Sequence, residues 1–359
     1  MGDLGRTGDL GRTCLLSVVV SSATLSAVLF LSSPSVVCRP WSRAFGTRRP
    51  GVSMASFLSS SQQLSSEPTA GVVHSIWEGT LPVIFELAKN EVTTLKAPEP
   101  ALKLVPRMSY LPLFAIDVVE HFRAKYAPPR VGGARSSEDN VFQNVWFEYK
   151  NQPLRWHLPA GVLFDATGNF AGDNLPWRIV VHFQGFPEDK IVRLDNLEAT
   201  RWNFMSELKQ AVHVRMGSSK TVLDLAMDDQ EQLWSAVETT NADAYWDINK
   251  ILITDVEDTR IARIPCRVVV ANKRTRSFQV FQRPIEPFRD MDGEKREVTT
   301  VHDALEKMYR AVDGTTADDG TTRRVMVQGI EMEPTEALLP LSNAMSHADN
   351  FLYIIVLEE

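Results

Sequence analysis

The pattern of apolar and polar residues between residues 82 and 184 predicts five short strands and one helix. Short segments alternate apolar and polar residues with period two, as strands do, while Ile116, Val119 and Phe122 recur at helical spacing within 115–127. The predicted strands are 82–88, 101–105, 145–149, 153–157 and 178–184. The resulting order, β-β-α-β-β-β, is that of a ubiquitin-like β-grasp, in which one helix covers one face of a mixed sheet.

After Asp195 the pattern changes to helices, which we predict over 197–215, 220–238 and 243–252. No strand pattern interrupts these segments. Helices of this length gain most of their stability by packing an apolar face, so we expect one compact helical unit between two sheets.

The C-terminal part repeats the pattern of the first part and predicts a second β-grasp fold. Its predicted elements are strands at 264–271, 277–282, 325–330 and 350–357, a helix at 300–312 and a short helical turn near 335–346. In the last strand both faces are apolar. One of them must therefore pack against another domain or a partner.

Several tryptophan-rich and helical motifs carry a resemblance to a known family. The segment 146–157 combines two tryptophans with a predicted hairpin, whose strands are separated by Asn151-Gln152-Pro153. The motifs are WFEYKNQPLRWH (146–157), WRIVVHFQGFPE (177–188), FMSELKQA (204–211), EQLW (231–234) and DNFLYIIV (349–356). Together they closely resemble the autophagy protein 5 family, from about Val72 to the C-terminus, in both order and spacing.

The resemblance implies an α+β fold in which two ubiquitin-like β-grasp domains flank a helical bundle, preceded by a short N-terminal helix. The expected division is an N-terminal extension at 1–71, the helix at 72–80, the first ubiquitin-like domain at 81–194, the helical domain at 195–258 and the second ubiquitin-like domain at 259–359. The chain departs from the family pattern mainly in extra polar residues around 128–140 and 312–322, which we expect to be surface insertions.

The N-terminal extension has its own character. The hexapeptide GDLGRT occurs twice in tandem and leads into a Ser-rich apolar stretch from Cys14 to Cys38, which four arginines follow. The stretch is typical of a cleaved signal, a membrane anchor or an organelle transit sequence, but an upstream extension of a chain that starts at Met54, or plain disorder, fits as well. If it spans a bilayer, the arginines on its C-terminal side leave the body in the cytosol.

Composition is that of a folded protein, with 44% apolar and 23% charged residues. The net charge of −7 understates the acidity of the body, because residues 1–53 carry a net +4 and leave −11 for the rest. Nucleic acid is a poor partner for such a surface. Three cysteines, of which only Cys266 lies in the body, build neither a disulfide framework nor a zinc site, and a reducing compartment fits best.

Residues for catalysis, metal or cofactor binding are not indicated. Cys266 alternates with Val268 and Val270 and is expected to point inward as a small buried residue. The seven histidines show no metal-ligand spacing, and neither a phosphate loop nor a dinucleotide fingerprint occurs. We expect no cofactor, no metal and no enzymatic activity.

One lysine gains a role from the resemblance. In the family, a lysine on the first helix of the helical unit accepts the C-terminal glycine of the ubiquitin-like autophagy protein 12 through an isopeptide bond. Lys209 stands at the matching position, with Lys220 and Lys250 as other possible acceptors. Phe204, Leu208 and Val212 predict the buried stripe of that helix; Lys209, turned by about 100° from Leu208, should reach solvent.

The resemblance further implies a non-enzymatic, cytoplasmic scaffold that associates peripherally with the phagophore membrane. It would bind autophagy protein 12, covalently or not, and the coiled-coil autophagy protein 16. The assembly would act like a ubiquitin ligase and promote lipidation of autophagy protein 8 by its conjugating enzyme. Ile76 and Trp77, on a helix predicted around 73–78, are candidate contacts for the coiled-coil protein, with core packing as the alternative.

Two other functions are compatible with the sequence. A β-grasp adaptor outside autophagy would keep the folds but lack the partner grooves. A thiol enzyme would use Cys266, which the inward position of that residue argues against.

Overall fold

The structure is a computed structural model, and it describes the chain from the first helix almost to the C-terminus. The described residues are 70–126 without 97, 142, 144–167, 175–253, 261–290 without 273, 296–312 and 323–358. The interpretations of the N-terminal stretch, and nearly all of the two expected insertions, lie outside these residues.

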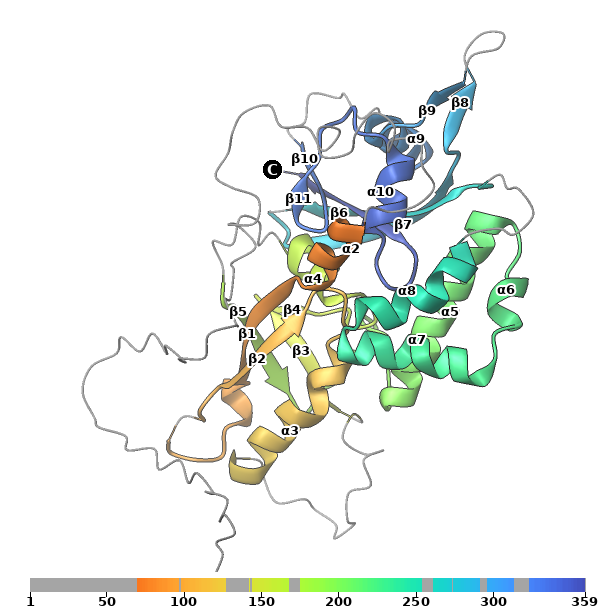
Figure 1. The fold of residues 1–359 in the computed structure, drawn as a ribbon. Helices are drawn as coiled ribbons and strands as arrows, with labels where there is room; N and C mark the ends of the chain where they lie inside the picture. Colours follow the sequence, from red (N-terminus) through yellow and green to blue (C-terminus); the bar gives the residue numbers. More distant parts are fainter. Residues whose placement is uncertain are drawn as a thin grey trace, which may run out of the picture. The chain divides into compact units, whose positions relative to one another are not determined.

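The first domain is a β-grasp, as predicted. Its elements are β1 (Thr80–Leu87), η2 (Lys89–Glu91), β2 (Ala101–Pro106), α3 (Pro112–Tyr126), β3 (Trp146–Tyr149), β4 (Gln152–Pro153), α4 (Ala160–Ala166) and β5 (Trp177–His182), and helix α2 (Ala70–Trp77) precedes them (Figure 1). The sheet order is β2-β1-β5-β3-β4, with β1 and β5 parallel and the other pairs antiparallel. Helix α3 buries Val118, Val119 and Phe122.

One local prediction in this domain was wrong, and one helix was not predicted. The hairpin turns at Lys150 and Asn151, both with positive φ, and its second strand ends at Pro153 instead of residue 157. The chain leaves the sheet there because Trp156 turns into the core, where its indole N–H donates to the carbonyl of Val192 over 2.8 Å. Helix α4 was not predicted, since all seven of its residues are buried and it shows no polar face.

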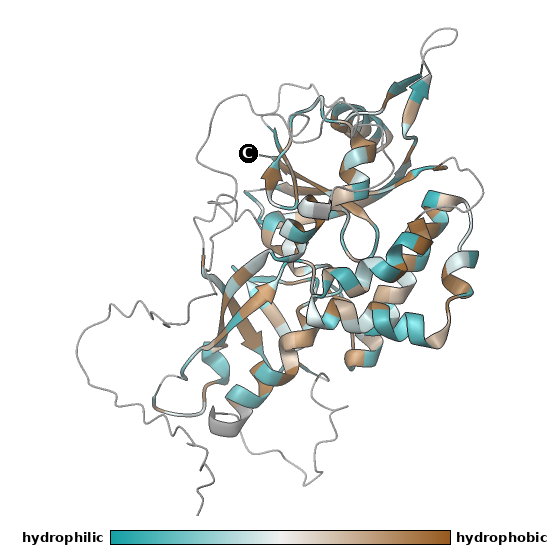
Figure 2. Cartoon of the chain, viewed as in Figure 1, coloured by the Kyte–Doolittle hydropathy of each residue, from teal (hydrophilic) through white to brown (hydrophobic). Residues whose placement is uncertain are grey.

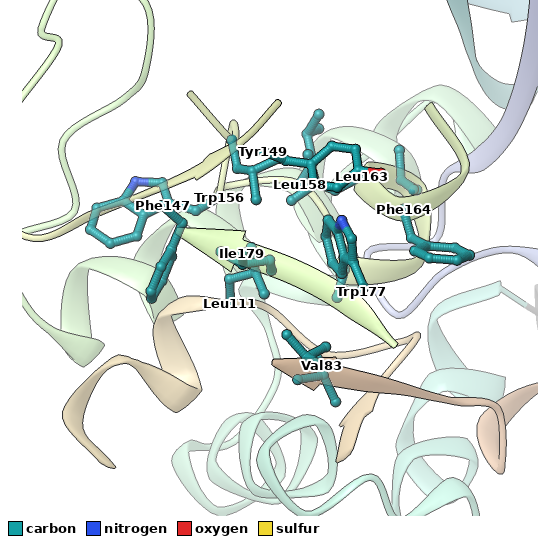
Figure 3. Packing of buried hydrophobic residues seen from close by; sticks show 14 of the residues in the cluster. Val83, Leu111, Phe147, Tyr149, Trp156, Leu158, Leu163, Phe164, Trp177 and Ile179 are labelled. Carbon is teal, nitrogen blue, oxygen red and sulfur yellow. The ribbon is translucent and has the colours of Figure 1, made fainter. Parts of the chain in front are cut away.

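The core of the first domain is aromatic. Trp177 packs edge-on against Tyr149 and Phe164, with ring centroids 6.0 and 5.5 Å apart, and Trp156 packs against Phe147 at 5.9 Å (Figure 3). The tryptophans that make the sequence conspicuous therefore fill the domain interior.

The helical unit consists of α5 (Leu197–Met216), α6 (Lys220–Leu223), α7 (Met227–Thr239) and α8 (Ala242–Ile253). The helix predicted over 220–238 is two helices, interrupted between Leu223 and Met227. Asp228 and Asp229 lie in the first turn of α7, where negative charge favours a helix start. Long helices of this unit show polar and apolar faces (Figure 2).

The second domain is also a β-grasp. It contains β6 (Ile264–Asn272), β7 (Ser277–Ile285), β8 (Phe288–Asp290), β9 (Arg296–Val298), α9 (Val301–Val312), β10 (Arg323–Val327), β11 (Ile330–Glu331), α10 (Leu338–Met345) and β12 (Leu352–Glu358). Its main sheet has the order β11-β10-β12-β6-β7. The β8–β9 hairpin was not predicted, and the strand expected at 325–330 is the β10–β11 hairpin, which turns at Gln328 and Gly329 with φ of 53° and 77°.

Strand β12 is buried on both faces, and each face belongs to a different apolar cluster. Tyr353, Ile355 and Leu357 share one cluster with α4 of the first domain. Leu352 and Ile354 share the other with α9 and α10 of the second domain. The apolar face for which the sequence required a cover is thus covered within the same chain.

A buried polar seam joins the two β-grasp domains. Arg107, which follows β2, forms an ion pair with Asp165 of α4 over 2.5 Å, and both residues are almost inaccessible. Burial raises the pKa of Asp165, an effect that the Arg107 charge opposes. From the second domain, the Gln328 amide donates to the Met108 sulfur over 3.5 Å, and Gly329 lies against the Arg107 guanidinium.

Replacing Gly329 with alanine tests how tightly the seam is packed. A Cβ atom there would lie 3.0 Å from an Arg107 guanidinium nitrogen, in addition to the cost of the positive φ. Gly185, with φ +65° and nothing within 4 Å, isolates the backbone cost. We expect Gly185→Ala to lower the free energy of unfolding by about 1 kcal/mol and Gly329→Ala by about 1–3 kcal/mol more, measured by urea denaturation. If both variants lose the same free energy of unfolding, the Arg107 side chain moves aside without a measurable energetic cost.

Candidate functional site

Helix α5 exposes one stripe of side chains and buries another. The buried stripe includes Phe204, Leu208 and Val212, as predicted. The exposed stripe includes Glu198, Trp202, Ser206, Lys209 and His213. Lys209 therefore lies on the solvent side of the helix, where the helical spacing placed it.

Both ends of α5 are capped. The Asn196 side chain accepts a hydrogen bond from the Ala199 backbone N–H over 2.7 Å, which satisfies a donor of the first turn. At the other end Gly217 adopts φ 74°, and its N–H donates to the carbonyl of His213 over 2.9 Å. The helix that carries Lys209 therefore has defined ends.

The inner side of α5 is fixed to the second domain through Glu207. Its carboxylate forms an ion pair with Arg267 of β6, whose guanidinium lies 3.7 Å from the centre of the Phe351 ring. Arg267 also donates to the Tyr353 hydroxyl over 2.9 Å, and that hydroxyl donates to Asp349 over 2.7 Å. These charge-assisted hydrogen bonds fix the middle of the helix two residues before Lys209.

A second anchor lies two turns further along the helix. Arg215 donates to the side chains of Asn343 and Ser342 of α10, the latter over 3.4 Å. Burial lowers the pKa of Arg215 to about 10. Lys209 is thus held between two anchors, with its backbone fixed and its side chain directed to solvent.

The surroundings of Lys209 leave its amine accessible. Among the described residues no carboxylate lies within ion-pair distance of it. Lys250, by contrast, pairs with Asp247 over 3.4 Å, and Lys220 is exposed at the start of α6. Exposure alone does not distinguish the three lysines, but the helix of Lys209 also carries an exposed aromatic side chain on the same side.

That aromatic side chain is Trp202, which is 69% exposed. It lies seven residues before Lys209, about 10 Å along the axis and on the same side of the helix. Because a tryptophan this exposed leaves a large apolar area in water, it is a candidate contact for a partner. Trp202 was not among the candidate residues predicted from the sequence, although its offset from the buried stripe indicates an exposed position.

Ile76 and Trp77 lie in the core. Each is 3% exposed, and the Trp77 ring lies 4.7 Å from that of Tyr245 in α8. This burial supports the core-packing alternative, and a direct contact of either residue with a partner stays a prediction. The exposed residues of α2 are polar, and His74 among them lies 3.3 Å from Asp243 of α8.

A reactive thiol, a metal-binding group or a membrane-spanning helix among the described residues would indicate another kind of function. Cys266 is 1% exposed, and burial raises the pKa of its thiol to about 12, which disfavours the nucleophilic thiolate. Within the part of the chain that the structure describes, no group of three His, Cys, Asp or Glu side chains could hold a metal ion. No described helix is long and apolar enough to span a bilayer.

Comparison with known proteins accounts for the order of the three parts. Three family models of autophagy protein ATG5 match the chain: the UblA domain over residues 76–183, the alpha-helical bundle region over 197–255 and the UblB domain over 263–356. The chain belongs to the autophagy protein 5 family.

Individual relatives agree with the family assignment. Autophagy protein 5 of Arabidopsis thaliana is 28% identical, covering 79% of this chain and 97% of its own length. The Drosophila melanogaster protein is 29% identical and covers 79% and 96%. The crystal structure of Kluyveromyces marxianus Atg5 matches with a TM-score of 0.63 at 20% identity, covering 80% of this chain and 99% of that one. This last match shows the common fold.

Removing the Glu207 charge should loosen α5 from the second domain. Glu207→Gln leaves the buried Arg267 without its carboxylate, so we expect the free energy of unfolding to fall by about 2–4 kcal/mol. Lys250→Gln, which removes only a surface pair with Asp247, should cost less than about 0.5 kcal/mol. Urea denaturation measures both, and a Glu207 effect as small as that of Lys250 would contradict the anchoring role.

Asp349 should make stability depend on pH. Burial raises its pKa to about 6, above the value of 3.8 expected in the unfolded chain, so the folded state takes up the proton first. Wild type should therefore gain stability relative to Asp349→Asn as the pH falls from 7 to 5, by about 1 kcal/mol. Urea denaturation of both proteins at the two pH values measures this difference, and a constant difference would refute the assignment.

Proposed function

We propose that this chain is a non-catalytic scaffold of a ubiquitin-ligase-like complex that promotes lipidation of autophagy protein 8 at the phagophore membrane. Membership of the autophagy protein 5 family is the observation that carries the proposal. In this function the protein joins autophagy protein 12 and autophagy protein 16 and acts by holding other proteins in place. The burial of Cys266 disfavours the alternative of a thiol enzyme that would use this residue.

Lys209 is the proposed acceptor of autophagy protein 12. Its amine would attack the carbonyl carbon of the C-terminal glycine, held as a thioester on a conjugating enzyme. The carbon–nitrogen bond forms, the carbon–sulfur bond breaks, and the cysteine leaves as a thiolate; the amine proton released as the amide forms passes to that thiolate or to water. Because a lysine amine is protonated at neutral pH, the conjugating enzyme has to remove the proton before the attack. The fixed helix below Lys209 supports the proposal, since a defined backbone position favours productive orientation.

The coiled-coil protein is proposed to bind beside α2. Ile76 and Trp77 would stabilise this surface by packing α2 against α8. The exposed side of α2 would then contact the partner. A β-grasp adaptor outside autophagy is the alternative function, and the family assignment favours the autophagy complex over it.

The Lys209→Arg variant tests the acceptor assignment. Arginine keeps the charge and the exposed position but cannot form the isopeptide bond under these conditions. After co-expression with autophagy protein 12 and its conjugating enzymes, we expect the wild type to show a slow-migrating conjugate in denaturing gels and Lys209→Arg to show none. Lys220→Arg and Lys250→Arg should leave the conjugate unchanged.

The outcomes separate the possible acceptors. A conjugate that persists in Lys209→Arg but disappears in one of the other two variants would move the acceptor to that lysine. If the wild type forms no conjugate but co-purifies with autophagy protein 12, the pairing is non-covalent. Circular dichroism of each variant controls for loss of fold.

A further inference from the structure

Strand β2 lies at the edge of the first sheet and carries two exposed leucines. Among the described strands it pairs with β1 alone, and Leu102 and Leu104 are 70% and 60% exposed. Lys103, between them, points to the other face and pairs with Asp117 of α3. Leu102 and Leu104 therefore share the face of the sheet that α3 does not cover.

The backbone groups of this edge that have no partner among the described residues belong to the same two leucines. The Arg107 N–H donates to the carbonyl of Gly79 over 2.8 Å, which places this pair at a hydrogen-bonded position of the β1–β2 ladder. In an antiparallel ladder the bonded pairs alternate with non-bonded ones, which makes Leu104 opposite Pro82 and Leu102 opposite Ile84 non-bonded pairs. Pro82 has no N–H to donate, which agrees with its place in a non-bonded pair. The N–H and C=O groups of Leu102 and Leu104 thus point away from β1.

In the second domain, the edge strand that corresponds to β2 is covered by other parts of the chain. Strand β7 is likewise an edge strand, and its Phe278 and Val280 pair with Ala271 and Val269 of β6. Both side chains pack, half-buried, against the cluster that contains α4. The equivalent leucines of β2 have no such cover among the described residues. One sheet face is thus covered within the chain, and its counterpart is left to solvent.

We propose that the open edge of β2 binds an extended peptide of another protein by strand addition. Its backbone would bond to Leu102 and Leu104, and two apolar side chains at alternate positions would lie on those leucines. Pro100 and Pro106 flank the segment and supply no N–H, so the paired stretch is short.

The small size of this surface favours binding of a short peptide over dimerisation with a second copy of the chain. Stable pairs of folded proteins bury about 800 Å² on each side, whereas this edge offers four backbone groups and two leucines. A peptide, which needs only main-chain pairing and two side-chain contacts, suits it better. Binding here is independent of Lys209, which lies on a different element.

Selection from a phage-displayed library of random heptapeptides on the full-length wild-type protein tests the proposal. We expect enriched peptides to alternate apolar and polar residues. Leu104→Pro removes an N–H of the open edge without breaking a bond to β1, so it should weaken binding of a synthesised enriched peptide at least tenfold, measured by fluorescence anisotropy. Leu223→Asn, which removes a leucine of α6 that is 61% exposed, is the control and should not weaken it.

The remaining outcomes are equally decisive. The double variant Leu102→Asn/Leu104→Asn, which keeps the backbone edge, should also weaken binding and replaces Leu104→Pro if circular dichroism shows that the latter is unfolded. Failure to enrich alternating peptides, or equal binding by the wild type and these variants, would overturn the proposal. Dimerisation of the wild type that Leu104→Pro abolishes, measured by sedimentation equilibrium, would assign the edge to a second copy instead.

Discussion

The fold depends on a single strand that is buried on both of its faces. Because successive side chains of β12 point to opposite sides, Tyr353 and Ile355 enter one apolar cluster and Ile354 the other. An apolar strand face exposed to water would be costly, so the second β-grasp sheet is complete only when α4 of the first domain covers it. The two domains and the helical unit thus share continuous apolar clusters. The position of α5 is defined by its contacts with these clusters and with the second domain.

The polar groups in these contacts contribute specificity more than stability. Removing Arg107 and Asp165 from water costs several kcal/mol per ion, and their attraction and hydrogen bonds do little more than balance that cost. Their geometry, however, is compatible with only one placement of Gly329 and of the hairpin to which it belongs. The pair between Glu207 and Arg267 has the same effect on α5. Apolar clusters supply the driving force, and these ion pairs select one alignment of the elements.

Much of the architecture could be predicted because strands and amphipathic helices leave periodic patterns. Helix α5 is the clearest case, since its buried stripe also fixed the exposed side of Lys209. Helix α4 escaped prediction because a segment buried all round has no periodicity, although it links the two domains. The early end of the hairpin at Pro153 depends on a hydrogen bond between Trp156 and the distant Val192, which no local pattern encodes. The sequence predicted the exposure of Lys209, whereas its anchors and its neighbour Trp202 required the three-dimensional contacts.

The two-sided burial of β12 has a consequence for how the protein is made. A ribosome adds residues 352–358 after all the other described strands and helices, so neither apolar cluster is complete before this strand has been added. Until then, the apolar surfaces that β12 covers are open to solvent and to chaperones. Addition of β12 therefore completes the second sheet and its contact with α4 together, and a nascent chain that stops before residue 352 lacks both.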